Sequence, residues 1–151
     1  MIGTLVHASF TIERRYPSAP SRVFSAFADP ALKARWFALP QEWVGAVHEL
    51  DFRVGGREFN HGRDPSGRTH TFESRFHAIV PDRRIVFAYD MRLDGEHVSV
   101  SLMTVELEPD GDGTLLTFNE QGAFFDGLED PAGREHGTGA LLDRLAGALA
   151  S

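Results

Sequence analysis

The stretch GREHGTGALLDRLAGALA, residues 133–150, decides the fold, because its apolar residues recur at the spacing of one helix face. That face is made of Leu141, Leu142, Leu145, Ala148 and Leu149. A helix of about 18 residues is roughly 27 Å long, enough to lie across a whole small sheet. The chain before it, from Phe10 to Gln121, alternates as short strands joined by tight turns. A curved sheet that grips one long helix leaves an apolar space between them, where small molecules bind.

The first turns of this segment are poor helix formers. Gly133, Gly137 and Gly139 lie close together, and each glycine weakens a helix by about 1 kcal/mol relative to alanine. Something other than helix stability must therefore favour glycine at these positions. We expect either close packing of the backbone or room for a ligand.

The sequence predicts an α+β fold, with a curved antiparallel sheet of about seven strands around a long C-terminal helix. Val6 to Tyr16 alternates as the first strand. Two short helices follow. The first has Ser18 as its expected N-cap and Pro20 in its first turn, and the second is capped by Asp29 and runs to about Phe37. Six further strands are expected at roughly 43–51, 57–63, 68–80, 83–91, 97–108 and 114–121.

Turn chemistry and hydrophobic pattern together predict the pairing of two hairpins. Around residues 110–113, one register puts the apolar residues on a single face: Leu107 opposite Leu116, Val105 opposite Phe118, and Met103 opposite Glu120. A two-residue turn at Asp94-Gly95 would push Phe87 off that face. We therefore expect a five-residue loop, Arg92 to Glu96, with Tyr89 opposite Ser99. The inward face then contains Ile85, Phe87, Tyr89, Met91, Ser99, Ser101, Met103, Val105, Phe118 and Glu120.

Length, composition and charge indicate how many domains the chain forms and which partners it is expected to lack. At 151 residues and 42% apolar content, residues 1–151 are expected to form one domain with its own core. The formal charge of -7, without a large basic cluster, argues against nucleic acid and anionic membranes as partners. The chain has no cysteine, so disulfides and thiol chemistry are excluded. We expect a cytoplasmic protein, because the sequence shows neither a signal peptide nor a membrane helix.

Glu120 is the strongest candidate for a catalytic or ligand-binding residue. It ends the last strand on the face that carries Phe118, where a buried carboxylate costs several kcal/mol unless it is paired. Arg134 and His136 open the helix at the same end of the sheet, so we expect Glu120 to contact one of them. Such a pair could serve in acid–base catalysis or orient a polar group of a ligand. The alternative, which is the commoner case, is a structural pair that pins the preceding loop to the sheet.

Two other patterns suggest sites but are better explained by turns. His61 and His70 are expected to face each other across the Asp64–Gly67 hairpin, at a Cβ distance of about 5 Å. Zinc sites need three or four protein ligands, so we predict no metal and no cofactor. Gly55-Gly56 is followed by a strand and not by a helix N-terminus, so a phosphate site is not expected there.

Aromatic residues are abundant, with 12 Phe, two Trp and two Tyr. Rings in this number can fill a core, or they can line a cavity and leave it partly open. Trp36, Phe37 and Trp43 flank the second short helix. They form either a gate at the mouth of the cavity or part of the core, and the sequence favours neither.

Several strings carry a family resemblance: Ile12-Glu13-Arg14, Pro20 to Phe24, Asp29-Pro30 with Trp36-Phe37, Asp51 to Gly56, Ile79 to Val86, and Thr114 to Phe118. With the order of elements, they resemble the START-like superfamily (SRPBCC, Bet v allergen-type), which has a helix-grip fold. Within it, the chain is similar to the branch named after the activator of heat-shock chaperone ATPase (Aha-type). Glu120-Gln121-Gly122 and Arg134 to Gly139 look like a bacterial subgroup often labelled polyketide cyclase.

The resemblance covers almost the whole chain and is specific for fold, but the superfamily supports many activities. It favours a protein that holds a hydrophobic, aromatic or polycyclic metabolite between the sheet and the C-terminal helix. One alternative is a cyclase- or hydrolase-like enzyme that uses Glu120 with His136 or Tyr89. Another is a partner that stimulates a chaperone ATPase, and a homodimer is left open. The residues expected to bind the ligand are Trp36, Phe37, Trp43, Phe87, Tyr89, Ser99, Ser101, Met103, Phe118, Glu120, Thr138, Leu141 and Leu145.

Overall fold

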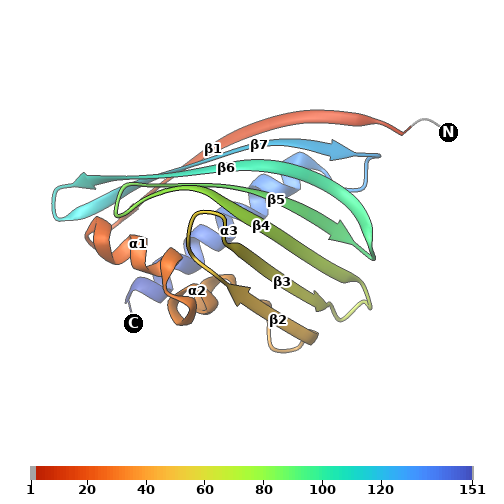
Figure 1. Ribbon diagram of the computed structural model, residues 1–151, viewed down its shortest axis with the longest axis horizontal. Helices are drawn as coiled ribbons and strands as arrows, with labels where there is room; N and C mark the ends of the chain where they lie inside the picture. The colour runs from red at the N-terminus through yellow and green to blue at the C-terminus, as the bar shows by residue number, and fades with distance from the viewer. Residues whose placement is uncertain (1–2, 151) are drawn as a thin grey trace.

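The alternating segments form one seven-stranded antiparallel sheet, as the sequence predicts, in a computed structural model that describes residues 3–150 (Figure 1). The elements in chain order are β1 (Leu5–Tyr16), α1 (Pro20–Ala28), α2 (Pro30–Phe37), β2 (Val44–Leu50), β3 (Arg57–Arg63), β4 (Thr69–Val80), β5 (Arg84–Leu93), β6 (Glu96–Asp110), β7 (Gly113–Phe125) and α3 (Pro131–Ala150). This order confirms the α+β helix-grip fold. None of the helices within residues 3–150 is long and apolar enough to cross a membrane.

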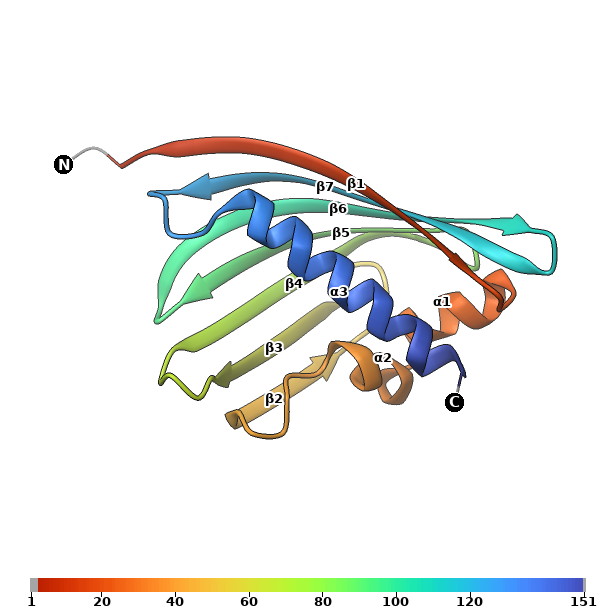
Figure 2. The ribbon, with the colours of Figure 1, turned by 180° about the vertical axis from the view of Figure 1, so that it is seen from behind.

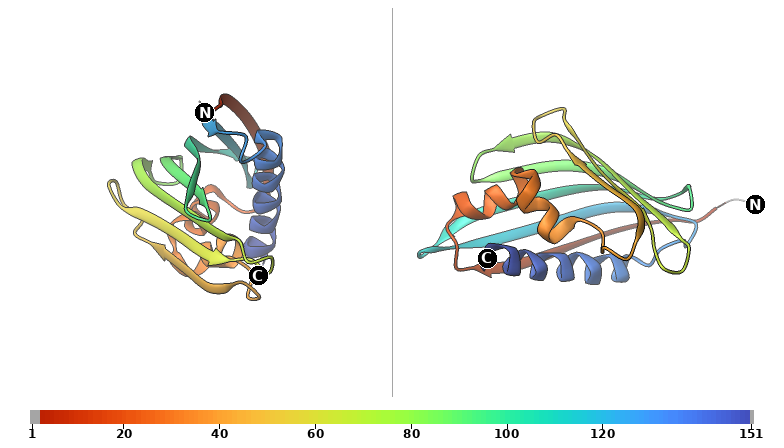
Figure 3. Two further views of the ribbon diagram at one scale, coloured as in Figure 1. Left: turned by 90° about the vertical axis from the view of Figure 1, so that its right-hand side faces the viewer. Right: turned by 90° about the horizontal axis from the view of Figure 1, so that it is seen from below.

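The strands lie in the order β1-β7-β6-β5-β4-β3-β2, so β1 and β2 form opposite edges of the sheet. In the sequence, α1 and α2 follow β1 and precede β2, so these two helices connect one edge of the sheet to the other (Figure 3). The sheet curves around the helices, and α3 runs diagonally across it from the end of β7 to α1 and α2 (Figure 2). This arrangement places α3 over the centre of the sheet.

The C-terminal half of α3 is held by the predicted apolar stripe. Leu142, Leu145, Ala148 and Leu149 are buried, and Leu141 is half-buried. Tyr16 of β1 donates a hydrogen bond from its buried hydroxyl to the carbonyl oxygen of Leu142, at 2.8 Å. The helix also contacts α1 and α2. The stripe therefore anchors α3 at one end, as its spacing indicates.

The short helices begin with proline, but only one has a side-chain cap. Asp29 caps α2 as predicted, because its carboxylate accepts a hydrogen bond from the backbone N–H of Ala31 at 2.9 Å. The prediction of Ser18 as the cap of α1 is wrong. The N-cap is Ala19, whose side chain makes no capping hydrogen bond. Pro20 at the first helical position has no N–H to satisfy, which reduces the need for a cap.

The register of the β6–β7 hairpin is confirmed, with Val105 opposite Phe118 and Met103 opposite Glu120. The five-residue loop between β5 and β6 is wrong. Asp94 and Gly95 both have positive φ and form a two-residue turn, with Leu93 opposite Glu96.

A β-bulge explains why the inward face is nevertheless the predicted one. Arg92 pairs with His97 but Met91 pairs with Ser99, so Val98 is an extra residue in β6. The extra residue shifts the register by one residue. As a result, Ser99, Ser101 and Met103 lie on the inner face, as predicted. Tyr89 thus lies opposite Ser101, not opposite Ser99.

The two histidines of the β3–β4 hairpin do not face each other, so that prediction is wrong. Gly62 pairs with His70, and His61 pairs with Thr71. The Asp64 side chain accepts hydrogen bonds from residues 66 and 68, which lengthens the loop by one residue. Within residues 3–150, no group of three or more His, Asp or Glu side chains is arranged to hold a metal ion.

Gly56 lies where the chain turns tightly before β3. A Cβ at this position would lie 2.1 Å from the carbonyl oxygen of Asp51, which is closer than any real contact. Gly147 of α3 has open space around it, so a Cβ there meets nothing. The backbone therefore leaves no room for a side chain at Gly56, whereas Gly147 can be replaced without a clash.

We expect the Gly56→Ala variant to lose about 2–4 kcal/mol of unfolding free energy, because the backbone must move to admit the methyl group. Gly147→Ala is the matched control and should gain up to about 1 kcal/mol from helix propensity. Urea denaturation of both variants measures the two changes. Equal effects of the two substitutions would contradict the close approach at Gly56.

Candidate functional site

A cavity of about 430 Å³ lies between the inner face of the sheet and the helices α2 and α3. Pockets of roughly 300–1,000 Å³ are typical of small-molecule sites. The wall is mainly aromatic and apolar, and its side chains include Trp36, Phe37, Trp43, Phe72, Phe87, Met91, Met103, Phe118 and Leu141. The space predicted between sheet and helix is therefore present.

The residues expected to bind a ligand fall into three groups. Those in the cavity wall are Trp36, Phe37, Trp43, Phe87, Tyr89, Met103, Phe118, Thr138 and Leu141. Ser99, Ser101 and Glu120 are fully buried in a polar cluster beside the wall. Leu145 packs in the core instead. Whether any of them contacts a ligand stays a prediction.

The aromatic residues around α2 divide between core and wall. Trp36 is 3% exposed, and its indole N–H donates to the carbonyl oxygen of Ala26 at 2.9 Å. Trp43 is half-buried, and its ring lies 4.6 Å from that of His70, which also lines the cavity. Trp36 is thus anchored in the core with one surface on the cavity, whereas Trp43 belongs to the wall.

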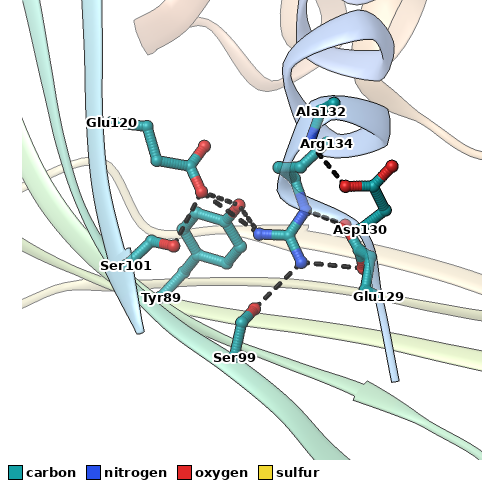
Figure 4. Close-up of polar contacts among 8 residues, drawn as sticks. All are labelled: Tyr89, Ser99, Ser101, Glu120, Glu129, Asp130, Ala132 and Arg134. Carbon is teal, nitrogen blue, oxygen red and sulfur yellow. Dashed lines mark hydrogen bonds and ion pairs between the residues drawn. The ribbon is translucent and has the colours of Figure 1, made fainter. Parts of the chain in front are cut away.

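Arg134, in the first turns of α3, is the centre of the polar cluster (Figure 4). Its guanidinium donates all five of its N–H groups. One nitrogen donates to Tyr89 at 2.5 Å and to Glu120 at 3.1 Å. Another donates to Ser99 at 2.9 Å, and two bonds go to the carboxylate of Glu129. A fully satisfied buried guanidinium is a rigid connection between the helix and the sheet.

Glu120 is 1% exposed and uses only one of its carboxylate oxygens. Oε2 accepts from the hydroxyls of Tyr89 at 2.9 Å and Ser101 at 2.7 Å, and from Arg134. Oε1 is buried and has no hydrogen-bond partner within residues 3–150. Of the two expected partners, the contact with Arg134 is therefore present. The other candidate, His136, is exposed and lies in a separate groove beside β1.

Local sequence explains how this cluster is assembled. Asp130 accepts from the backbone N–H of Ala132 at 3.1 Å, which starts α3 so that Arg134 points at the sheet (Figure 4). Gly122 leaves room for its neighbour on β6, because a Cβ there would lie 2.7 Å from the hydroxyl oxygen of Ser101. The bulge in β6 brings Ser99 to the same face.

The electrostatics of the cluster favour hydrogen bonding over proton transfer. Burial raises the pKa of Tyr89 well above its ordinary value, so its hydroxyl stays protonated and donates to Glu120. Burial alone would lower the pKa of Arg134, but its bonds to Glu129 outweigh that and raise it. The guanidinium therefore stays charged. The cluster is a fixed polar wall at one end of the cavity.

A second buried polar cluster, which the sequence did not reveal, lies at the α2 end of the cavity. Lys33 donates to Glu58 at 3.1 Å, and His48 contacts the other oxygen of Glu58 at 2.8 Å. The Lys33 and Glu58 side chains are only 4% and 1% exposed. Burial alone would raise the pKa of Glu58, but the Lys33 charge and the hydrogen bonds from His48 and Lys33 lower it.

The helix glycines show both of the expected reasons for their presence. Gly133 and Gly137 line the cavity, and a Cβ at either position would meet open space. Gly139 is buried, and a Cβ there would lie 3.2 Å from the Arg14 guanidinium. Room beside the cavity thus explains the first two positions, and close packing explains the third.

Comparison with known proteins gives both a family and close structural relatives. The family model described as Activator of Hsp90 ATPase homolog 1-like protein matches residues 17–150. The crystal structure of Mll3558 from Rhizobium loti is 49% identical, with a TM-score of 0.89, and the match covers 96% of this chain and 99% of that one. A putative uncharacterized protein from Rhizobium leguminosarum is 40% identical, with a TM-score of 0.93 and coverage of 99% and 98%.

A more distant structure, the AHSA1-like protein from Aeromonas hydrophila, shares the fold. It is 23% identical, with a TM-score of 0.70, and the match covers 94% of this chain and 92% of that one. No curated protein matches the sequence. The relatives therefore establish ancestry and fold, and the function has to be argued from the site.

The first prediction for the site concerns Arg134. We expect Arg134→Met to lower the free energy of unfolding by about 3–5 kcal/mol, because the buried carboxylate of Glu120 and the half-buried one of Glu129 lose their counter-ion. Arg144 of the same helix is exposed, and its guanidinium makes one long bond, 3.4 Å, to the carbonyl oxygen of Ala38, so Arg144→Met should change the free energy of unfolding by less than about 1 kcal/mol. Urea denaturation compares the two. A loss at Arg134 no larger than that at Arg144 would mean that the cluster does not hold the helix.

The second prediction concerns acid stability. The pKa of Glu58 is lower in the folded chain than its ordinary value of about 4.5. Its ionised form therefore stabilises the fold fully above that value, and this contribution is lost as the pH falls through the lower folded pKa. We expect the stability difference between wild type and Glu58→Gln to shrink as the pH falls from about 6 to about 3. A pH-independent difference in chemical denaturation would contradict the ion pair.

Proposed function

The chain belongs to the Activator of Hsp90 ATPase homolog 1-like family, and we propose that it binds a hydrophobic aromatic small molecule in the cavity between the sheet and α3. The observation that supports the proposal best is the cavity itself, with a volume of about 430 Å³ and a wall rich in aromatic side chains. In a protein that binds no ligand, we would expect side chains to fill such a space, because protein interiors pack densely.

The wall suits a flat ring. Phe37 and Phe72 meet edge to face, with ring centroids 5.0 Å apart, and Phe72 lies 4.7 Å from Tyr89. Edge and face contacts of this kind are the geometry that aromatic ligands use. Met91 and Met103 complete the wall, and the flexible thioether chain adapts to irregular shapes.

The size of the expected affinity follows from buried area. A ligand of two fused rings that buries roughly 250 Å² gains about 6 kcal/mol at about 25 cal/mol per Å², which corresponds to a Kd of tens of micromolar. Binding of this strength is measurable by titration. Tighter binding requires polar contacts at the ends of the cavity.

The catalytic alternative has less support. Its acid–base pair was Glu120 with His136 or Tyr89, but His136 is exposed and remote from the cluster. Tyr89 stays protonated, and the oxygen of Glu120 that faces it already accepts three hydrogen bonds. Stimulation of a chaperone ATPase rests on the family name alone. We further propose that the protein acts in the cytoplasm as a single domain, as its composition suggests.

We expect the uncharged environment-sensitive dye Prodan to bind the protein with one-to-one stoichiometry and a blue-shifted emission. Gly137→Phe should weaken this binding at least tenfold, because the ring enters the open space beside the cavity. Phenylalanine is no worse a helix former than glycine, so the fold should survive.

Gly147→Phe is the matched control, since Gly147 lies on the same helix, has open space around it and does not line the cavity. It should leave the Kd for Prodan unchanged. Equal binding by wild type and Gly137→Phe, with both proteins folded by circular dichroism, would place the dye elsewhere.

A further inference from the structure

Asn60, in the wall of the cavity, has a hydrogen-bond acceptor that is unpaired among the described residues. The residue is 6% exposed and lines the cavity wall. Its amide nitrogen donates to the carbonyl oxygen of Phe37 at 3.0 Å, and only the nitrogen side of the amide can do so, which fixes the orientation. The other amide atom, Oδ1, is buried without a partner within residues 3–150. A buried acceptor of this kind is costly unless something donates to it.

Lys33 offers a donor at the same end of the cavity. An ammonium has three N–H groups. That of Lys33 makes one hydrogen bond to a residue that the structure describes, the 3.1 Å bond to Glu58. It otherwise lies over aromatic rings, the nearest being Phe37 with its centroid 4.6 Å away. Because Glu58 already balances its charge, Lys33 can offer a hydrogen bond without needing a further anion.

Phe37 contacts both Lys33 and Asn60. The ring of Phe37 lies against the Lys33 ammonium, and its backbone carbonyl holds Asn60. Asn60 is also two residues from Glu58 on β3, so both side chains point to the inner face. In the part of the chain that the structure describes, the cavity wall at its α2 end therefore contains both an ammonium with unused donors and an unpaired acceptor.

We propose that this end recognises a hydroxyl group on an aromatic ring, and that the ligand is a neutral phenol-type compound; the inference rests on the function proposed above. A phenolic hydroxyl accepts from Lys33 and donates to Asn60 Oδ1 at once. The ring then lies along Phe37 and Phe72, whose centroids are 5.0 Å apart.

Other polar groups fit less well. A carboxylate would meet the Asn60 oxygen with an oxygen of its own, and it would add a negative charge where Lys33 is already paired with Glu58. A methyl ether or ketone accepts but cannot donate, so Asn60 Oδ1 would remain unpaired. Of these groups, only the hydroxyl satisfies both partners.

The test uses four probes that share one ring system: 2-naphthol, 2-methoxynaphthalene, naphthalene and 2-naphthoate. Displacement of Prodan at neutral pH measures the affinity of each probe for the wild-type protein. We expect 2-naphthol to bind at least tenfold more tightly than naphthalene and 2-methoxynaphthalene, and 2-naphthoate to bind most weakly. Equal affinities for 2-naphthol and naphthalene, or tightest binding of 2-naphthoate, would overturn the hydroxyl site and leave the cavity as a plain apolar one.

A substitution at Asn60 then tests whether this residue causes the preference for 2-naphthol over naphthalene. Asn60→Leu has similar volume and no acceptor, so 2-naphthol should bind it no more than about twofold better than naphthalene, while the affinity for naphthalene is retained. His61→Leu on the same strand is the control and should keep the full preference, because His61 does not line the cavity. A tenfold preference that persists in Asn60→Leu would overturn the role of Asn60.

The series on wild type decides the proposal even if Asn60→Leu does not fold. Failure of the underlying function gives a different result, in which neither Prodan nor any of the four probes binds. That result would overturn both proposals together, whereas equal binding of the uncharged probes overturns only the hydroxyl site.

Discussion

The hydrogen bonds of Arg134 hold the first turns of α3 against the sheet, and the cavity depends on them. The other end of the helix is anchored by Leu142, Leu145 and their apolar neighbours, which pack on the core. A helix fixed at both ends can cross the middle of the sheet without filling the space beneath it. Gly133 and Gly137 add to that space, because neither has a side chain to place there. The cavity is thus a consequence of where the helix is attached, and not of a loosely packed core.

The two polar ends of the cavity differ in what they leave unused. At the α3 end, all five N–H groups of Arg134 donate to residues of the protein, and the Oε1 that is unpaired within residues 3–150 belongs to Glu120, which does not line the cavity. At the α2 end, Lys33 and Asn60 retain a donor and an acceptor. Between them the wall is aromatic and apolar. A ligand with one polar group is therefore expected to bind in a single orientation, with its polar group beside α2.

Much of this fold could be predicted from the sequence, because short-range patterns of apolar residues determine it. The alternation of β6 and β7 determines their pairing, and the leucine spacing determines which face of α3 is buried. The turn before β6 could not be predicted, because a two-residue turn followed by a bulge at Val98 buries the same side chains as a longer loop. The Lys33–Glu58 pair was missed for another reason. It joins a helix to a distant strand, and such a pair leaves no local signal that separates it from two exposed charges.

The central claim is that aromatic molecules bind inside the cavity, and nuclear Overhauser effects from a ligand to methionine methyl groups test it most directly. Met91 and Met103 both line the cavity, whereas Val100 and Leu102 are 39% and 41% exposed on the outer face of β6. In a sample with 2-naphthol and methyl-labelled protein, we expect effects between the naphthol ring and the methyl groups of Met91 and Met103. Effects confined to Val100 and Leu102, with Met91 and Met103 unchanged, would show that the ligand binds outside and that the cavity is not its site.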